Sequence, residues 1–172
     1  LNAQGSALEF QEKINNYQEG AIVPFFVAAD MEGCLNPFEN FQEFPTLNDI
    51  DTTLQAFKFG VEAGRVMKRL GFNMNFAPVL DLEDKILGCR SFNGGVDDVV
   101  EKGKMFIAGL HEAGILAVAK HYPGKTLVGQ DTHLEITGAK IDSEDLLPFE
   151  EAVAAGVDGI MVNHVIVNGL VD

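Results

Sequence analysis

The apolar positions of this chain follow a repeating pattern in which a helix-like segment ends at glycine and an apolar run follows at once. Three glycines mark these junctions, Gly71, Gly114 and Gly156, and they are 43 and 42 residues apart. Glycine suits the position because a helix C-terminus commonly needs one residue with a left-handed backbone. The runs after them predict strands over residues 73–81, 115–121 and 159–164, and a run that follows Gly20 predicts an earlier strand over residues 22–30.

The segments between these runs have apolar residues three or four positions apart, which is the spacing of an amphipathic helix. We predict helices over residues 59–70, 96–110 and 147–155. Asp142 and Ser143 are candidate N-caps of the third helix, and Pro148 lies near its start.

Strands that are apolar on both faces and alternate with helices predict a parallel sheet covered by helices. Both a (β/α)8 barrel of the TIM type and a doubly wound sheet fit this pattern. We favour the barrel because every predicted strand ends on Asp, Lys or His, as an active-site rim built from many strands requires. A whole barrel needs eight strands and about 250 residues. We therefore expect residues 1–172 to be one partial barrel domain, truncated at the C-terminus and inactive on its own. Its open edges predict either self-association or missing segments that once completed the fold.

Composition narrows the class of partner. The 172 residues include 26 acidic and 12 basic side chains, a net charge of -14, which disfavours nucleic acid or an anionic membrane surface. The chain has no apolar run of eighteen residues and no signal-peptide pattern at its start. It begins with Leu1, so localisation stays open: we favour the cytoplasm, with secretion if an upstream signal has been removed. Cys34 and Cys89 have no metal-ligand or redox spacing, and we predict free thiols.

Long connections follow the predicted strands, at residues 32–45, 82–95 and 122–142, and loops of this length are usually functional. Asp131 and His133 in the third loop are two positions apart, so in an extended segment they project to the same side. The carboxylate can then hydrogen-bond the imidazole and favour its protonated form, which makes His133 a candidate proton donor. A solvated surface pair is the alternative.

Residues 120–124, Lys-His-Tyr-Pro-Gly, followed by Asp-Thr-His at 131–133, resemble the Lys-His-Phe-Pro-Gly…Asp-Ser-His signature of the glycoside hydrolase family 3 β-N-acetylglucosaminidases. The similarity covers most of the chain. It includes Asp-Met-Glu-Gly at 30–33, Asn-Phe-Ala-Pro-Val-Leu-Asp at 75–81, Arg-Ser-Phe at 90–92, and the helix and strand over 147–164. The resemblance implies retaining hydrolysis of terminal non-reducing β-linked N-acetylglucosamine from oligosaccharides or cell-wall glycans, with no cofactor and no metal.

The resemblance also implies the site residues. His133, oriented by Asp131, is the acid/base group, and the nucleophilic aspartate lies beyond Asp172. The expected substrate-binding residues are Asp30, Arg90, Lys120, His121 and His164. We expect the first four of these to converge at the C-terminal ends of the strands, because vicinal sugar hydroxyls need a carboxylate acceptor and cationic donors from different strands.

Alternatives remain for several of these residues. Arg90 and Lys120 could instead form an ion pair that closes the rim, Asp81 is better explained as a buried carboxylate that fixes a loop, and His164 could be a core histidine. Two departures from the family pattern concern specificity: Cys34-Leu35 replaces a Gly-Arg pair, and Lys125 replaces a histidine.

Two other functions remain open from the sequence. A metal-dependent hydrolase would use His121, His133, His164 and Asp30 as ligands, and a sugar-binding fragment would have no catalysis. Within the favoured function, phosphate could replace water as the acceptor, because a histidine acid/base does not repel an incoming anion.

Overall fold

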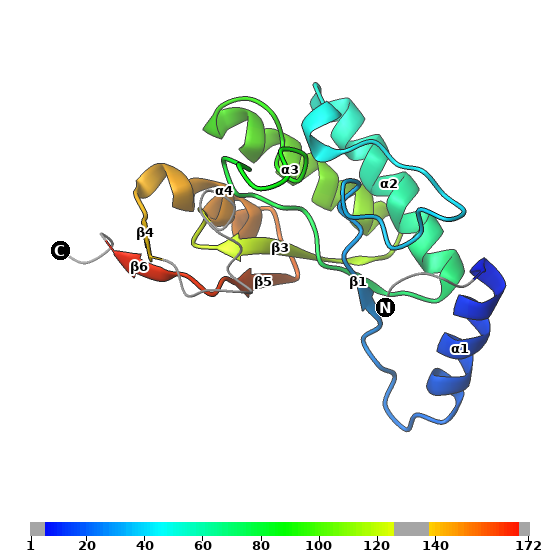
Figure 1. The fold of residues 1–172 in the computed structure, drawn as a ribbon. Helices are drawn as coiled ribbons and strands as arrows, with labels where there is room; N and C mark the ends of the chain where they lie inside the picture. Colours follow the sequence, from blue (N-terminus) through cyan, green and yellow to red (C-terminus); the bar gives the residue numbers. More distant parts are fainter. Residues whose placement is uncertain (1–5, 126–137, 169–172) are drawn as a thin grey trace.

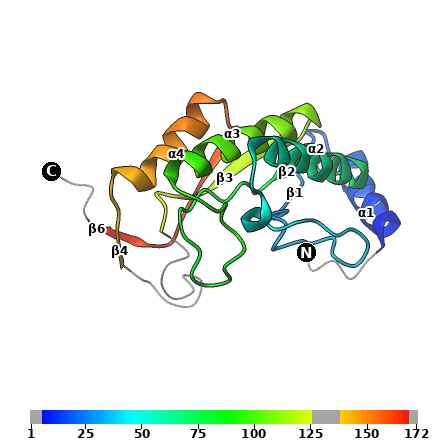
Figure 2. The same ribbon diagram turned by 90° about the horizontal axis from the view of Figure 1, so that it is seen from above.

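The computed structural model describes residues 6–125 and 138–168, and its centre is a four-stranded parallel sheet. The strands are β1 (Ala28–Ala29), β2 (Met74–Asn75), β3 (Leu116–Tyr122) and β5 (Gly159–Val162), in the order β1-β2-β3-β5. They are connected by α2 (Thr53–Leu70), α3 (Val96–Glu112) and α4 (Ser143–Ala154), which lie in a row on the same side of the sheet (Figures 1 and 2).

This topology decides between the two predicted folds. A doubly wound sheet reverses its strand order and carries helices on both faces, whereas each strand here pairs with the next one in the same direction. The arrangement is that of a (β/α) barrel, so the favoured fold class is confirmed. In the described ranges the sheet is open and does not close on itself (Figure 1).

The predicted helices occur, and their ends follow from capping. Gly71 ends α2 in a left-handed conformation with φ 95°, as a C-terminal glycine should. α4 begins at Ser143, earlier than the predicted residue 147, because Asp142 caps it by accepting from Glu144 N. The sequence reasoning missed α1 (Ala7–Glu19), although its capping box was readable: Ser6 accepts from Glu9 N, and Glu9 accepts from Ser6 N.

The strands are shorter than predicted. Residues 22–26 do not form a strand, and Ile22 in that stretch is fully exposed. Pro78 interrupts the ladder after β2, because proline has no N–H to donate. Pairing then resumes: Lys120 N donates to Pro78 O (3.1 Å) and Leu80 N to Lys120 O (2.7 Å). A further parallel pair that the sequence did not predict is formed by β4 (Gly138–Lys140) and β6 (Ile166–Asn168).

The helix layer packs closely where α2 and α3 cross. A Cβ atom on Gly60 would lie 2.3 Å from Phe106 O, and one on Gly109 would lie 2.3 Å from Phe57 O, so only glycine permits this backbone approach. The ring of Phe59 packs edge-on against Phe106, with 5.3 Å between centroids. This contact holds together α2 and α3, the helices that precede β2 and β3.

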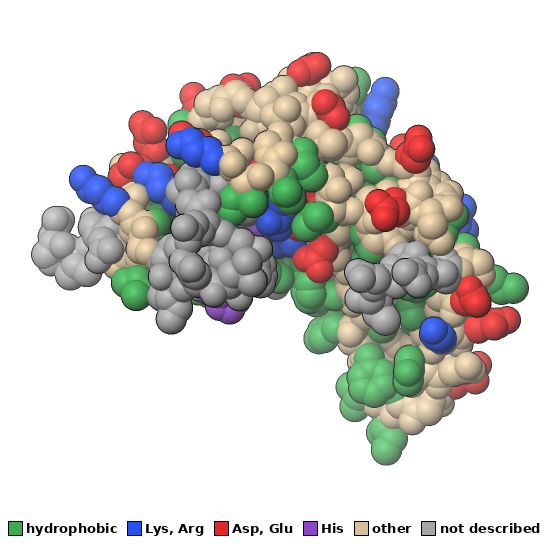
Figure 3. Space-filling model, in the orientation of Figure 1, with side chains coloured by type: hydrophobic (Ala, Val, Ile, Leu, Met, Phe, Trp, Pro, Cys, Tyr) green, Lys and Arg blue, Asp and Glu red, His purple; other side chains and the backbone are tan. Residues whose placement is uncertain are grey.

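The surface in Figure 3 carries many acidic side chains over the helix layer, in keeping with the net charge of -14. Hydrophobic side chains gather at the end of α1, where Ile22, Val23 and Phe26 are exposed. Across residues 6–125 and 138–168, no helix is both long enough and apolar enough to cross a membrane.

Candidate active site

Four charged side chains from three strand ends form one ion-pair network. Asp30 follows β1 directly, Glu32 comes two residues later, Arg90 lies in the connection after β2, and Lys120 lies on β3. Lys120 Nζ is 2.6 Å from Asp30 Oδ1 and also contacts Glu32 Oε1. Arg90 donates from Nε to Glu32 Oε2 (2.7 Å) and from a terminal nitrogen to Glu32 Oε1 (3.0 Å).

Burial divides this network into a closed part and an open part. The side chain of Glu32 is 0% exposed and that of Lys120 is 2% exposed, whereas the side chain of Asp30 is 54% exposed. Burial alone would lower the pKa of Arg90, but the hydrogen bond and charge of Glu32, helped by Asp81 and Asp84, raise it. The guanidinium therefore stays charged. Asp30 is the member of the network whose side chain is open to solvent.

His121 is held beside this network by Asp81. Its Nδ1 lies 2.8 Å from Asp81 Oδ2, and its backbone N–H donates to the same oxygen at 3.1 Å. A carboxylate only accepts, so Nδ1 carries the proton. Nε2 lies 3.5 Å from an Arg90 terminal nitrogen, and a guanidinium nitrogen can only donate. Asp81 is fully buried, and it fixes His121 at a strand end.

The four residues expected to converge, Asp30, Arg90, Lys120 and His121, therefore lie together at the C-terminal ends of the strands. Arg90 and Lys120 both pair with Glu32, so the ion pairing that was the alternative for these two residues is present. Their contact with a sugar stays a prediction. In Figure 3 basic and acidic side chains lie side by side near the middle of this face.

Glu32 is the site residue that the sequence reasoning missed. In the sequence it stands within the Asp-Met-Glu-Gly motif, and in the structure it is the carboxylate that pairs with both Arg90 and Lys120. One signal was available: Asp30 and Glu32 are two positions apart at a strand end, so in extended backbone they project to the same side.

The other predicted site residues have different outcomes. His164 follows β5 and is exposed, so it is not a core histidine. Asp131 and His133 lie outside the described residues, and their roles stay predictions. Within the described residues, no group of three or more His, Cys, Asp or Glu side chains is placed to hold a metal.

The prediction of free thiols is wrong. Cys34 and Cys89 form a disulfide, and their Cα atoms are 5.6 Å apart, within the usual range for such a bond. The two cysteines are 55 positions apart in the chain. Only the folding of the connections after β1 and β2 onto one another brings them together, so their spacing could not reveal the bond.

Lys125, the second departure from the family pattern, turns toward the start of α4. Its Nζ lies 2.8 Å from Asp145 Oδ2 and 3.3 Å from Asp142 Oδ2 and donates to Lys140 O at 3.0 Å. The hydrogen bond to Asp145 raises the pKa of Lys125. This cation therefore stabilises the N-terminal end of α4 together with the residues that precede it.

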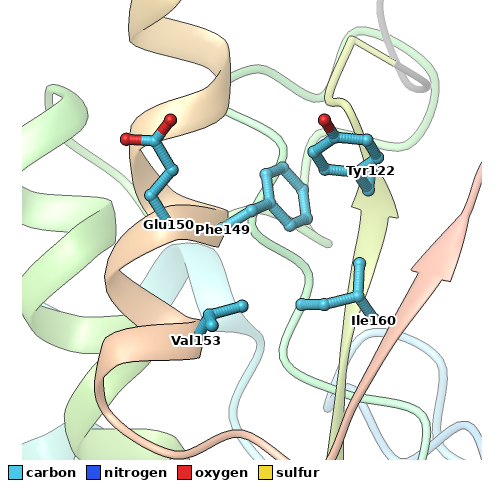
Figure 4. Close-up of a pocket in the computed structure, with 5 residues that line it drawn as sticks. All are labelled: Tyr122, Phe149, Glu150, Val153 and Ile160. Atoms are coloured by element: carbon cyan, nitrogen blue, oxygen red, sulfur yellow. The ribbon is translucent and has the colours of Figure 1, made fainter.

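An apolar pocket lies between α4 and the strands, away from the charged network. Figure 4 shows Phe149 and Val153 of α4 facing Ile160 of β5 and Tyr122 of β3. Tyr122 packs edge-on against Phe149 with 5.6 Å between ring centroids. The lining of this pocket is almost entirely apolar, so the pocket suits an apolar packing partner better than a hydroxyl-rich ligand.

Asp84 organises the connection that carries Arg90. Its Oδ1 accepts from the N–H groups of Ile86 and Leu87, and its Oδ2 accepts from those of Cys89 (3.1 Å) and Arg90 (2.9 Å). Burial alone would raise the pKa of Asp84, but these backbone donors lower it. The charged carboxylate is therefore the form that holds the loop.

Replacement of Asp84 by alanine should lower the free energy of unfolding by roughly 1–3 kcal/mol at neutral pH, since backbone donors lose a charged acceptor. The folded-state pKa is lowered, so the stabilisation exists above the unfolded pKa and is lost as pH falls through the folded one. Urea unfolding of wild type and variant at several pH values measures this. Glu83→Ala, which removes only an exposed pair with Lys85, is the control and should change little. A difference that persists unchanged in acid would contradict this role.

The fold and the site together define a class: a (β/α)-barrel domain with a charged network at the carboxyl ends of its strands. The sequence model of the "Glycosyl hydrolase family 3 N terminal domain" matches residues 2–172. The chain therefore belongs to glycosyl hydrolase family 3, as the motif resemblance implied.

Curated relatives carry a more specific name. The chain is 34% identical over 174 residues to a protein named Beta-hexosaminidase from Tolumonas auensis, covering 92% of this chain and 52% of that protein. It is 35% identical over 175 residues to one of the same name from Haemophilus influenzae, covering 92% and 50% respectively. This chain thus spans about half the length of the curated relatives it matches.

A solved structure agrees in fold. The glycoside hydrolase family 3 β-N-acetylglucosaminidase from Paenibacillus sp. str. FPU-7 superimposes with a TM-score of 0.82 at 27% identity. The match covers 95% of this chain and 34% of that one.

Proposed function

We propose that this chain is the sugar-binding part of a β-N-acetylhexosaminidase, and that the whole protein releases terminal non-reducing β-linked N-acetylglucosamine from glycans. The observation that carries the proposal is the network of Asp30, Glu32, Arg90 and Lys120 at the strand ends of a family 3 domain. The names of the curated relatives support it.

The chemistry of the network suits a neutral ligand rich in hydroxyl groups. Asp30 is half exposed, and the contact with Lys120 orients its carboxylate, which can accept from two vicinal hydroxyls. Lys120 gives two of its three N–H donors to Asp30 and Glu32, which leaves a third for a ligand. Because two carboxylates offset two cations, the network can bind an uncharged sugar through hydrogen bonds alone.

His121 adds a group of defined polarity. With Nδ1 bound to Asp81, Nε2 is the ring nitrogen that faces Arg90, so a ligand hydroxyl that binds there would take the place of the long Arg90 contact. We propose that Nε2 and the Arg90 guanidinium contact neighbouring hydroxyls of the terminal sugar, and that the exposed His164 also binds the sugar.

For the chemical steps we propose retaining hydrolysis with His133 as acid/base, oriented by Asp131. The nucleophile would come from a part of the whole protein that is not in this chain. Neither described aspartate of the site suits that role: Asp81 is fully buried and holds His121, and Asp30 is engaged by Lys120. Water would be the acceptor, with phosphate as a minor variant.

We further propose that residues 1–172 are one partial barrel domain and that, on their own, they self-associate. The edge formed by β5 is open in the described structure, and Val153, Val162 and Ile166 around it are exposed. An open strand edge beside exposed apolar side chains favours pairing with another chain.

The assay that tests the function uses the full-length protein that contains this sequence. It should hydrolyse a 4-nitrophenyl N-acetyl-β-glucosaminide much faster than the matching β-glucoside, which lacks the acetamido group. Asp30→Asn, which keeps shape but weakens the acceptor, should reduce kcat/KM by roughly 10–100-fold, the effect of one hydrogen bond to a charged group. Activity on neither substrate, or full activity of Asp30→Asn, would contradict the proposal.

A further inference from the structure

The disulfide lies next to the ion pair that forms the closed part of the site. Cys34 is two residues after Glu32, and Cys89 directly precedes Arg90. The covalent bond therefore joins the same two connections that the Glu32–Arg90 pair joins, within two residues of it on both sides. The disulfide and the ion pair together restrict the position of the Arg90 guanidinium more than the ion pair would alone.

The connection that carries Arg90 has few other restraints. Residues 85–88 are exposed, Leu87 among them at 54%. A Cβ on Gly88 would meet nothing within 4 Å, so no neighbour packs against the backbone there. The hydrogen bonds to Asp84 lie within this connection, whereas the disulfide joins it to the connection after β1. Exposed backbone with few packed contacts opens at low free-energy cost.

We propose that the Cys34–Cys89 disulfide is a positioning cross-link that holds Arg90 in its sugar-binding orientation. The inference rests on the proposed function, because it takes Arg90 to be a substrate-binding group. A dithiol reductant breaks the bond through a mixed disulfide: each cysteine sulfur takes one electron and one proton, and the reductant becomes a cyclic disulfide. Cys34 and Cys89 are both partly exposed, so a small dithiol can reach the bond.

Loss of the cross-link should weaken sugar binding more than it slows the reaction. Arg90 would contact the sugar both before and in the transition state, and removing such uniform binding raises KM while kcat stays nearly constant. Partial loss of one charge-assisted hydrogen bond corresponds to a rise in KM of roughly tenfold. A purely structural role would instead lower the amount of active enzyme, and so kcat, with KM unchanged.

The experiment uses the full-length protein, oxidised and reduced, and the variant Cys34→Ser/Cys89→Ser. Peptide mapping without reductant should find the Cys34–Cys89 cross-linked peptide. Reduction of wild type, and the double variant, should both raise KM for the N-acetylglucosaminide by roughly tenfold with kcat within about twofold. Amide hydrogen exchange over residues 84–92 should become faster in both. Reductant should not affect the double variant, which separates this bond from any other thiol chemistry.

Several outcomes would overturn the cross-link: absence of the cross-linked peptide, or an unchanged KM in reduced protein whose two thiols titrate freely. The comparison of oxidised with reduced wild type decides the question even if the double variant does not fold. If no glycoside is turned over in either state, the proposed function has failed. Hydrogen exchange then tests the cross-link independently of activity. Equal exchange over residues 84–92 in the oxidised and the reduced protein would refute the positioning role of the disulfide.

Discussion

In the full-length protein, His133→Ala should lower kcat for an N-acetylglucosaminide by roughly 10²–10⁴-fold while KM changes little, because general acid/base catalysis is worth that much in rate. The reason is chemical. In the mechanism proposed above, loss of the imidazole means that the glycosidic oxygen must leave unprotonated and that no group activates the water that follows. Asp131→Ala should leave binding nearly intact and be almost as severe in rate, because the unpartnered imidazole loses its orientation. Steady-state kinetics of the three proteins measures this.

The leaving group supplies an internal control. A 2,4-dinitrophenyl glycoside has an acidic leaving group that departs without protonation, so His133→Ala should slow formation of the glycosyl-enzyme much less with this substrate. A burst of dinitrophenol followed by slow turnover is the expected signature. Equal loss of binding and rate with every leaving group would instead make His133 a substrate-holding residue.

Replacement of Glu32 should be the most destabilising single change in the described network. Its carboxylate pairs with both Arg90 and Lys120, and all three side chains are at least 89% buried. Removal of one partner from a buried ion pair leaves an uncompensated charge and costs about 3–5 kcal/mol. Glu32→Gln, which keeps the size of the side chain, should therefore lower the free energy of unfolding by about that amount in urea titrations.

Glu43→Gln is the matched control, because Glu43 is an exposed glutamate in the same connection after β1. Its free energy of unfolding should change by less than about 0.5 kcal/mol. Addition of Lys120→Met to Glu32→Gln should recover part of the loss, since one of the two stranded cations is then removed. If Glu32→Gln and Glu43→Gln unfold at the same urea concentration, water reaches the network and the burial argument fails.

The sequence by itself determined the alternation of helices and strands, because the signals are local. A glycine that ends a helix, an Asp that caps one and a run of apolar residues each act within a few positions, and Gly71 and Asp142 do so in the structure. The polar residues at the C-terminal ends of the strands could be predicted for the same reason. Parallel strands bring their carboxyl ends to one edge, so Asp30, Lys120 and His121 were predicted to meet before any contact was known.

Only the tertiary structure decided the contacts between distant segments. The order β1-β2-β3-β5, which selects the barrel over the doubly wound sheet, depends on which strands pair. Glu32 meets Arg90 across 58 positions, and Cys34 meets Cys89 across 55. No local pattern encodes such pairs, because each residue's own surroundings in the sequence suit a solvated side chain equally well. Their partners are set by how the two connections fold over the strand ends.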